Sequence, residues 1–571
     1  MFTESDIYLG EILINNKLIS REQLDKALEE QKKAGGFIGE IIVNLGFADE
    51  KEVFELISKK INIPYIRIKE TKIEESITKS VPARYAYHYS VIPVSKKGKT
   101  LTVAMSDPLD VAVRDDLELL LGFSIEPALS RKKDILEEIS RYYGVGAETL
   151  ERMIDQSAPK QKESTHTQHG SEEIRDVSID ASISRLVNQI LLEAHEKRAT
   201  DIHIEPYEGE VKIRYRIDGV LYQAPVPEEL KYFNQSIISR IKIMASLNIA
   251  EKRLPQDGKI KVKIGGEDLN LRVSILPTPF GESVNIRLLN TDIRLGLKNL
   301  GFADKDLTML ENIIKKPHGI ILVTGPTGSG KTTTLYSCLD KINQVDRKII
   351  TIEDPIEYQL KGITQIQIHP QIDLSFARGL RSMLRHDPDV MMVGEIRDYE
   401  TAEIAIRVAL TGHLVFSTLH TNDSAGAITR LLDMGVEPYL IASSVECIVA
   451  QRLVRVLCPH CKSKEIPKQE ALGELGIKTT QNIHIFENKS CSKCRFTGFL
   501  GRTAIYEILS LNEEIRGLIL NRRASSDIKK AALKTGMKTM RENGWDKIRK
   551  GITTISEVLR VTQEEGDLEY K

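Results

Sequence analysis

One short stretch of the chain constrains its fold more than any other. Residues 321–336 read ILVTGPTGSGKTTTLY, with the spacing Gly-x-x-x-x-Gly-Lys-Thr at 325–332. An apolar strand, a glycine-rich turn and a helix start follow one another, an order in which backbone N–H groups surround nucleotide phosphates. Lys331 is expected to reach the β- and γ-phosphates, and Thr332 is expected to bind Mg²⁺. The candidate ATP-binding residues are Gly325, Pro326, Thr327, Gly328, Ser329, Gly330, Lys331, Thr332 and Thr333.

Two further apolar runs end in acidic residues. The first is IITIEDPIEYQ at 349–359, and the second is PDVMMVGEIRD at 388–398. Acidic side chains at strand ends near a phosphate loop hold Mg²⁺ or orient the attacking water. Glu395 is the first choice for orienting water and, with Thr332, for binding Mg²⁺, while Glu357 is the alternative base.

Histidines and arginines supply the remaining candidates for catalysis. His413 and His420 flank a third apolar run, and at least one of them is expected to sense the γ-phosphate. Arg272 and Arg287 lie on alternating-pattern strands and are candidate arginine fingers, which stabilise charge in phosphoryl transfer. Taken singly, each arginine is also compatible with a surface salt bridge.

Four of the six cysteines form two Cys-x-x-Cys pairs, a pattern typical of a structural zinc site. Two close pairs joined by a longer loop supply four thiolates, and such a site leaves no open position for catalysis. Its predicted Zn²⁺ ligands are Cys458, Cys461, Cys491 and Cys494.

Length and charge limit the classes of protein that fit. The chain has 571 residues, enough for about four domains. Its net charge of -1 argues against a protein that coats nucleic acid. No apolar run is long enough for a transmembrane helix, and the first residues do not resemble a secretory signal, so a cytoplasmic location is expected.

Pattern changes along the chain predict a multi-domain α/β protein. Residues 8–31 and 37–60 repeat each other, and the polar stretch after 145 reads as a flexible linker. From about 296, short apolar strands alternate with helices, which indicates a largely parallel sheet covered on both faces. The expected units are a tandem helical module at 1–60, an α/β domain at 61–145, a linker at 146–178, an α+β domain at 179–292, and an ATPase domain at 293–571 that contains the cysteine segment 455–500.

The boxes GPTGSGKTTTLY, TIEDPIE, LRHDPDVMMVGEIRDYETAEIA and TGHLVFSTLHTND occur in this order. Together they resemble the Walker A, Asp, Walker B and His boxes of the type II/IV secretion ATPase superfamily. The resemblance implies a RecA-like P-loop core, a preceding PAS-like α+β domain, and ATP hydrolysis by a hexamer with Mg²⁺ as cofactor.

Within that superfamily the chain looks like a pilus extension ATPase of the PilB family, with the type II secretion ATPases of the GspE family as the alternative. The resemblance implies an inner-membrane platform protein of the PilC/GspF type and other cytoplasmic components of the pilus machinery as partners. It also implies a position at the inner face of the cytoplasmic membrane without insertion. Two other classes, a non-motor nucleotide-gated scaffold and a nucleic-acid translocase, fit the intact boxes and the near-zero charge less well.

The repeat at 1–60 resembles the MshEN module, a receptor for cyclic-di-GMP. Each family motif opens with Arg-Leu-Gly, whereas this chain has Tyr8-Leu9-Gly10 and Phe37-Ile38-Gly39. Without the two guanidinium groups the interpretation of the module shifts from cyclic-di-GMP binding to docking.

Overall fold

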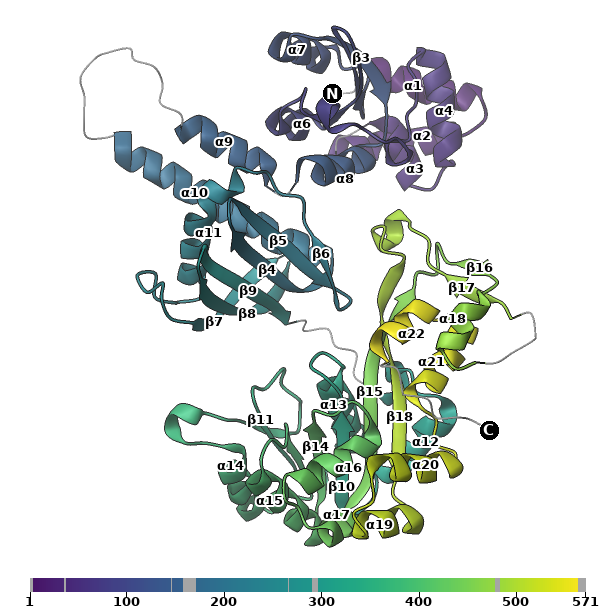
Figure 1. Ribbon diagram of the computed structural model, residues 1–571. Helices are drawn as coiled ribbons and strands as arrows, with labels where there is room; N and C mark the ends of the chain where they lie inside the picture. Colours follow the sequence, from purple (N-terminus) through teal and green to yellow (C-terminus); the bar gives the residue numbers. More distant parts are fainter. Residues whose placement is uncertain are drawn as a thin grey trace. The chain divides into compact units, whose positions relative to one another are not determined.

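The computed structural model describes residues 4–34, 37–144, 146–157, 171–264, 266–289, 296–477 and 483–562. The chain divides into two compact units, residues 1–289 and 290–571. Each unit is considered by itself, with the element labels of Figure 1.

The N-terminal repeat folds as two helix pairs. Their bounds are α1 Glu4–Asn15, α2 Arg21–Ala34, α3 Ile38–Asn44 and α4 Glu50–Ile61. Ser20 and Gln23 form a reciprocal capping box at the start of α2, because each side chain accepts the other's backbone N–H. The helices enclose a small apolar core that includes Phe37 and Phe54, whose ring centroids lie 6.3 Å apart.

An α/β domain follows the helical module. A three-stranded sheet in the order β1-β2-β3 carries an antiparallel hairpin and one parallel pair. The hairpin turns at Gly98, where φ is +61° and glycine avoids the steric cost of a left-handed backbone. The elements are α5 Glu75–Thr78, α6 Ala83–Tyr89, β1 Val91–Lys97, β2 Thr100–Met105, α7 Val111–Leu121, β3 Ser124–Leu129 and α8 Lys132–Tyr143.

The structure differs from the linker predicted at 146–178. Helix α9 spans Ala147–Ser157, and helix α10 spans Ser171–Glu196. Leu150 and Met153 of α9 are buried in the same core as α10, so the linker prediction does not hold for 147–157 or 171–178. Two apolar positions one turn apart are too few to stand out as a period in the sequence. Residues 158–170 lie outside the described part of the chain.

The α+β domain is an antiparallel six-stranded sheet in the order β6-β5-β4-β9-β8-β7. The hairpin that joins β5 to β6 turns at Asp218-Gly219, where both residues have positive φ. Its elements are β4 Ala199–Tyr207, β5 Glu210–Ile217, β6 Val220–Gln223, α11 Leu230–Met244, β7 Gln256–Ile264, β8 Glu267–Thr278 and β9 Gly281–Leu289.

The second unit contains the predicted parallel sheet. Seven strands lie in the order β12-β11-β13-β14-β10-β15-β18, and all neighbours are parallel except β15 and β18. The strands are β10 Gly319–Thr324, β11 Ile349–Glu353, β12 Thr364–Gln367, β13 Val390–Val393, β14 Leu414–Leu419, β15 Val445–Leu457 and β18 Phe499–Ser510.

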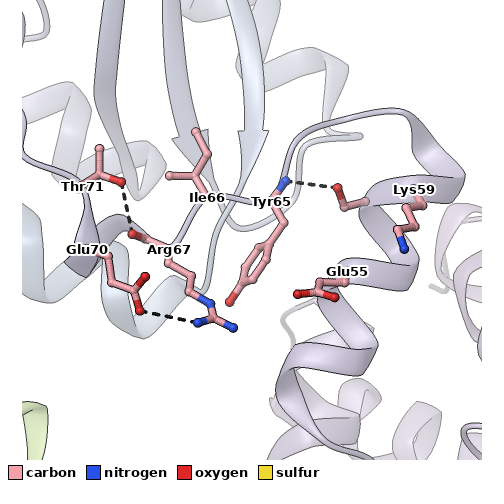
Figure 2. A pocket seen from close by; sticks show the side chains of 8 residues that line it. Glu55, Lys59, Tyr65, Ile66, Arg67, Glu70 and Thr71 are labelled. Atoms are coloured by element: carbon pink, nitrogen blue, oxygen red, sulfur yellow. Dashed lines mark hydrogen bonds and ion pairs between the residues drawn. The ribbon is translucent and has the colours of Figure 1, made fainter.

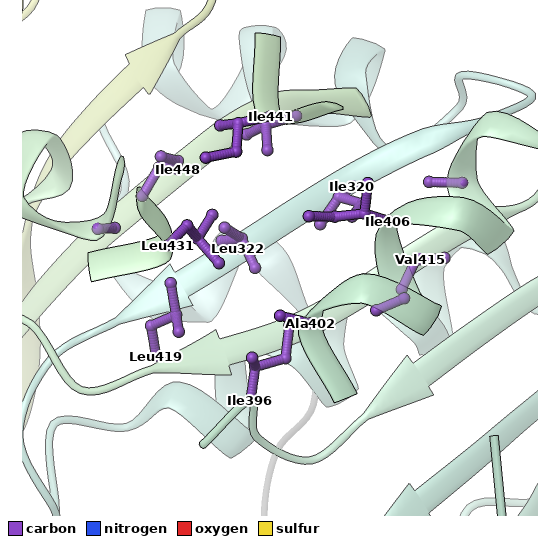
Figure 3. Packing of buried hydrophobic residues seen from close by; sticks show 14 of the residues in the cluster. Ile320, Leu322, Ile396, Ala402, Ile406, Val415, Leu419, Leu431, Ile441 and Ile448 are labelled. Atoms are coloured by element: carbon purple, nitrogen blue, oxygen red, sulfur yellow. The ribbon is translucent and has the colours of Figure 1, made fainter. Parts of the chain in front are cut away.

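Helices cover both faces of this sheet (Figure 1). Alternate residues of β10 point to opposite sides: Ile320 and Leu322 join the core drawn in Figure 3, while Ile321 and Val323 join a second core. The helices are α12 Asp304–Ile313 and α13 Lys331–Ile342 on the second core, and α14 Phe376–Met383, α15 Tyr399–Leu410, α16 Ser424–Asp433, α17 Pro438–Ser444, α19 Glu513–Leu520 and α20 Ser525–Lys534 on the first.

The cysteine segment is an insertion between β15 and β18. Its described residues form a short antiparallel pair, an α-helix and a 3-10 turn at Ser492–Cys494, and α21 and α22 follow α20 near the end of the described chain. These elements are β16 Ser463–Glu465, α18 Gln469–Glu474, β17 Ile485–Glu487, α21 Met540–Arg549 and α22 Ile555–Val561.

A buried carboxylate ties α22 to β15. Glu557 has a side chain only 2% exposed, and it accepts hydrogen bonds from Arg455 Nη2 at 2.8 Å and Arg560 Nε at 2.9 Å. Burial by itself would raise the pKa of Glu557, but the hydrogen bonds from Arg560 and Arg455 outweigh burial and lower it to about 2. The charged form of Glu557 therefore stabilises the folded unit.

We expect Glu557→Gln to destabilise the second unit at pH 7 by on the order of 2 kcal/mol. The folded pKa is depressed, so this stabilisation exists above the ordinary pKa near 4.5 and disappears as pH falls toward 2. Thermal unfolding of both proteins from pH 7 to pH 3 measures the difference, which shrinks below about pH 4.5. Glu400→Gln is the matched control, because its ion pair with Arg381 is exposed. A difference independent of pH would contradict this account.

Candidate active site in the second unit

The phosphate loop, residues 325–332, connects the end of β10 to the start of α13. Gly325, Gly328 and Gly330 all have positive φ, and a Cβ on Gly325 would lie 2.6 Å from the Gln451 carbonyl oxygen. Lys331 folds back over the loop, where its Nζ donates to the carbonyls of Gly325 at 2.8 Å and Pro326 at 3.1 Å. Burial lowers the pKa of Lys331 to about 8. The loop thus has the backbone and the lysine that a nucleotide phosphate requires.

Gln451 fixes the shape of the phosphate loop, and sequence reasoning missed it. Its buried side chain donates from Nε2 to the Ser329 carbonyl at 2.7 Å and accepts from Thr334 Oγ1 at 2.8 Å. One amide therefore joins β15 to both the loop and α13. The available signal was a polar residue directly after the apolar run CIVA at 447–450.

Glu395, His420 and Lys331 lie close to one another. Glu395 follows β13, and its Oε2 lies 3.3 Å from His420 Nε2 while its Oε1 pairs with Arg397. Burial lowers the pKa of His420, and the charge of Lys331 lowers it further, which favours a neutral ring. Because β10, β13 and β14 are parallel and adjacent in the sheet, their carboxyl ends bring these side chains to one edge of it.

Gly394 occupies the position where many ATPases have an aspartate. A Cβ there would lie 3.3 Å from the Ile352 carbonyl oxygen and 3.3 Å from Glu353 Cα, so the neighbouring strand leaves little room for a side chain. Glu353 is itself buried, and it accepts hydrogen bonds from Tyr336, Thr351 and Gln365. Glu353 therefore links β11 to α13 and β12 through Tyr336 and Gln365. Glu395 is the acid whose charge acts on Lys331.

His413 does not meet the other candidates. It precedes β14, whereas His420 follows that strand, and six strand residues separate them by about 20 Å. The His413 carbonyl accepts from the Gly319 N–H at the start of β10, and its Nδ1 lies 3.1 Å from the Val408 carbonyl oxygen. Two histidines at opposite ends of one buried strand cannot share a site, and only His420 lies at the end that carries the phosphate loop.

Glu357 lies on the chain between β11 and β12 and is half-buried. Its negative charge acts on Tyr358, whose phenol packs edge-on against Tyr336. Glu395, in contrast, contacts His420 directly, and its charge acts on Lys331. Glu395 is therefore the acid that lies beside His420 and Lys331.

Arg272 and Arg287 belong to a charged row in the first unit. Register places Lys259, Arg272, Arg287, Asp201 and Arg216 opposite one another on β7, β8, β9, β4 and β5. Residues directly opposite one another share a face of the sheet, so four cations and one carboxylate form the basic row. Asp201 lies 2.8 Å from Arg287 Nε and 3.8 Å from Arg216 Nε. The row has an excess of positive charge on one face of this sheet.

The four cysteines converge as the sequence predicts. Their sulfur atoms all lie within 4.8 Å of one another, with Sγ distances of 3.8 Å for Cys458–Cys491, 3.8 Å for Cys461–Cys494 and 3.7 Å for Cys491–Cys494. Zinc–sulfur bonds of about 2.3 Å in a tetrahedron require sulfur atoms about 3.8 Å apart. The Gly498 N–H donates to Cys494 Sγ at 3.2 Å, which orients the ligand. The geometry is thus compatible with a tetrahedral metal ion.

A separate pocket of about 480 Å³ lies between α4 and residues 65–71, the segment that follows α4 in the chain. Figure 2 shows Tyr65 between Glu55 on α4 and Arg67 on the following segment. Arg67 pairs with Glu70 at 3.5 Å, and Lys59 is the other basic side chain of the lining. Two acids offset two bases, so this pocket has no excess of positive charge for a phosphate ligand.

The fold and the loop define a P-loop nucleotide-binding protein. The family model described as "Type II/IV secretion system protein" matches residues 176–560, and the "MshEN domain" model matches residues 61–149. The chain is 44% identical to the type IV pilus assembly ATPase PilB of Myxococcus xanthus over 96% of this chain and 98% of that protein. It is 41% identical to type II secretion system protein E of Xanthomonas campestris, over 97% and 98% of the two chains.

A solved structure of the pilus retraction motor PilT with bound ADP is also similar, at 28% identity over 67% of this chain and 99% of that chain, with a TM-score of 0.45. The protein belongs to the type II/IV secretion system family, and it is an ATPase.

The MshEN model matches the α/β domain at 61–149, which corrects the expectation that this module is the repeat at 1–60. Within the repeat, the ring of Phe37 is buried in the helical core. This position packs the module together and presents no charge to a ligand.

We expect Gln451→Ala to weaken ATP binding about five- to fiftyfold, because it removes the donor to the buried Ser329 carbonyl and the acceptor of the Thr334 hydroxyl and loosens the loop. Titration of the purified protein with ATP, alongside thermal unfolding, measures the effect. Gln344→Ala is the matched control, since Gln344 is exposed in the same unit. Unchanged ATP affinity in a folded variant would show that Gln451 does not fix the loop.

Proposed function

We propose that the protein is the motor ATPase that drives type IV pilus assembly, working as a homo-hexamer at the inner face of the cytoplasmic membrane. The observation that carries the proposal is the similarity to a PilB along nearly the whole of both chains, N-terminal region included. Both the N-terminal domains and the ATPase unit therefore have counterparts in a protein named for pilus assembly.

In this mechanism Lys331 and the N–H groups of the phosphate loop hold the phosphates of ATP. Thr332 and Glu395 would hold Mg²⁺, which would neutralise charge on the phosphates. Glu395 orients the attacking water, with Glu357 as the alternative. The contact between Glu395 and His420 supports a role for His420 in sensing the γ-phosphate, since a change at one side chain reaches the other.

Arg272 and Arg287 stabilise the charge of the transition state in this proposal. Their position in the basic row supports it, because the row contains four cations and one carboxylate. Arg214 is a poorer candidate, since Glu205 accepts two hydrogen bonds from it at 2.7 Å.

The proposed partners are an inner-membrane platform protein of the PilC/GspF type and the other cytoplasmic components of the pilus machinery. No helix in the described ranges is long and apolar enough to cross a bilayer. In this proposal the motor acts on the membrane assembly through a protein contact. We propose docking, rather than cyclic-di-GMP binding, as the role of the N-terminal module, and the buried Phe37 supports this choice. Nucleic acid is not among the proposed partners.

Type II secretion is the second candidate, because a type II secretion protein E matches the chain over a similar length at 41% identity. In that case the motor would assemble a pseudopilus for protein export. The two candidates share the enzyme and differ in the assembly that it drives.

We also propose that the cysteine segment holds Zn²⁺ through Cys458, Cys461, Cys491 and Cys494. The sulfur distances support this choice, and four protein ligands give the ion a structural role. The ion would then hold the two Cys-x-x-Cys turns together at the base of the insertion.

Purified wild-type protein is expected to hydrolyse ATP as a hexamer. Lys331→Ala should abolish ATP binding and turnover, and Glu395→Gln should lower kcat by about 10²- to 10⁴-fold while retaining ATP binding. Steady-state phosphate release and native mass spectrometry measure activity and assembly. Glu400→Gln serves as an acid-to-amide control outside the site. Full turnover in Glu395→Gln would transfer the role of base to Glu357.

The same variants in the source cell distinguish the two candidate assemblies. Deleting the gene should remove surface pili and leave protein export intact, and wild type, but not Lys331→Ala, should restore the pili. Electron microscopy and the profile of exported proteins provide the two readouts. Loss of export with intact pili would replace the first candidate with the second.

We expect purified protein to hold one zinc ion per chain, measured by elemental mass spectrometry. Cys461→Ser should lower the zinc content and the unfolding temperature, because three thiolates bind the ion less well than four. Cys338→Ala is the control, since Cys338 is buried away from the cluster and should leave the zinc content unchanged. A protein without metal, or a Cys461→Ser variant that keeps its zinc, would contradict the site.

A further inference from the structure

Strand β15 places a second polar residue beside the phosphate loop. Thr324, the last residue of β10, pairs in register with Ala450 on β15. Gln451 and Arg452 are the next two residues, so they lie where the phosphate loop leaves the sheet. Gln451 contacts the loop itself, whereas the Arg452 side chain lies against the chain that follows β14.

The guanidinium of Arg452 is only partly satisfied by the protein. Its Nη2 donates to Asn422 Oδ1 at 2.9 Å and to the Asn422 carbonyl at 3.4 Å. Its Nη1 is buried and has no acceptor within the described ranges. A buried N–H group of a charged side chain without an acceptor is unfavourable, so this nitrogen favours a ligand that brings an oxygen atom.

The electrostatic environment of Arg452 also favours a phosphate ligand. Burial lowers the pKa of Arg452, although the carboxylate of Asp423 acts against burial. The charge of Arg452 also acts on Lys331 and helps to lower the pKa of that lysine. Two cations that destabilise each other near a phosphate loop are both stabilised by a polyphosphate.

We propose that Arg452 is an ATP-binding residue of the same subunit, whose unpaired Nη1 donates to an oxygen of the β- or γ-phosphate while Nη2 stays on Asn422. Phosphate is the chosen contact because a guanidinium offers only donors and Lys331 is the neighbouring cation. The proposal rests on ATP binding by this loop, which the family supplies, and not on pilus assembly.

In this arrangement Asn422 is connected to the bound nucleotide through Arg452. Asn422 lies two residues after His420 and precedes Asp423, which caps α16 by accepting the Gly426 N–H at 2.8 Å. A phosphate bound to Arg452 is thus connected, through one asparagine, to the segment that carries His420. Arg452 is in this sense both a ligand of the phosphate and a support for the His420 segment.

The test compares the affinities of full-length wild type, Arg452→Gln and Arg452→Lys for ATP, ADP and AMP by calorimetric titration and by competition. Arg452→Gln should lose about ten- to hundredfold in affinity for ATP, as expected for a lost hydrogen bond between charged groups, and should change AMP binding less than about threefold. Arg452→Lys keeps the charge and should retain part of the affinity.

Arg407→Ala is the control, because Arg407 pairs with Glu403 on the exposed side of α15. Thermal unfolding shows whether each variant folds. If Arg452→Gln does not fold, the comparison of wild type with Arg452→Lys provides the test. Unchanged ATP affinity in a folded Arg452→Gln would overturn the proposal, and so would an equal loss for ATP, ADP and AMP, which would place the guanidinium on the adenosine or the α-phosphate. Wild-type protein that binds no ATP would instead refute the ATPase function.

Discussion

The site of the second unit depends on the parallel register between β10 and its two neighbours. Thr324 pairs with Leu419 on one side and with Ala450 on the other. The three strands are therefore aligned at this level, and the phosphate loop, the segment with His420, and Gln451 with Arg452 meet at one edge of the sheet. Thr324 reinforces this alignment, because its hydroxyl bonds the Leu419 carbonyl and accepts the N–H of Thr421. A shift of one residue in either pairing would move the side chains to the opposite face.

In the first unit, the register of antiparallel strands likewise brings residues that are distant in the chain together. Five charged residues that are far apart in the chain form one row, because each lies opposite the next. Asp201 pairs with two of the four cations, so the row contains structural ion pairs. Arg287 is thus both a salt-bridge residue, through Asp201, and a catalytic candidate, because it lies in this basic row.

The N-terminal repeat shows how two glycines and one aromatic ring determine the packing of a small helical module. Both copies of the repeat carry a glycine at the same place, and a Cβ at Gly10 or Gly39 would collide with Leu24 or with Phe37 and Ile57. Phe37 fills the core of the helical module. These positions therefore serve the packing of the helices.

Local order along the chain is enough to predict several features, and the tertiary contacts decide the others. The phosphate loop, the acid after β13, the two cysteine pairs and the parallel sheet all follow from short patterns of residue type, and the order of the patterns indicated the family with which the comparisons agree. His413 and His420, in contrast, look equivalent in the sequence, but a strand holds them at opposite edges. Gln451 lies about 120 residues from the phosphate loop along the chain and contacts it only because β15 pairs with β10. Contacts between distant segments depend on strand register and burial, and neither is encoded in a local pattern.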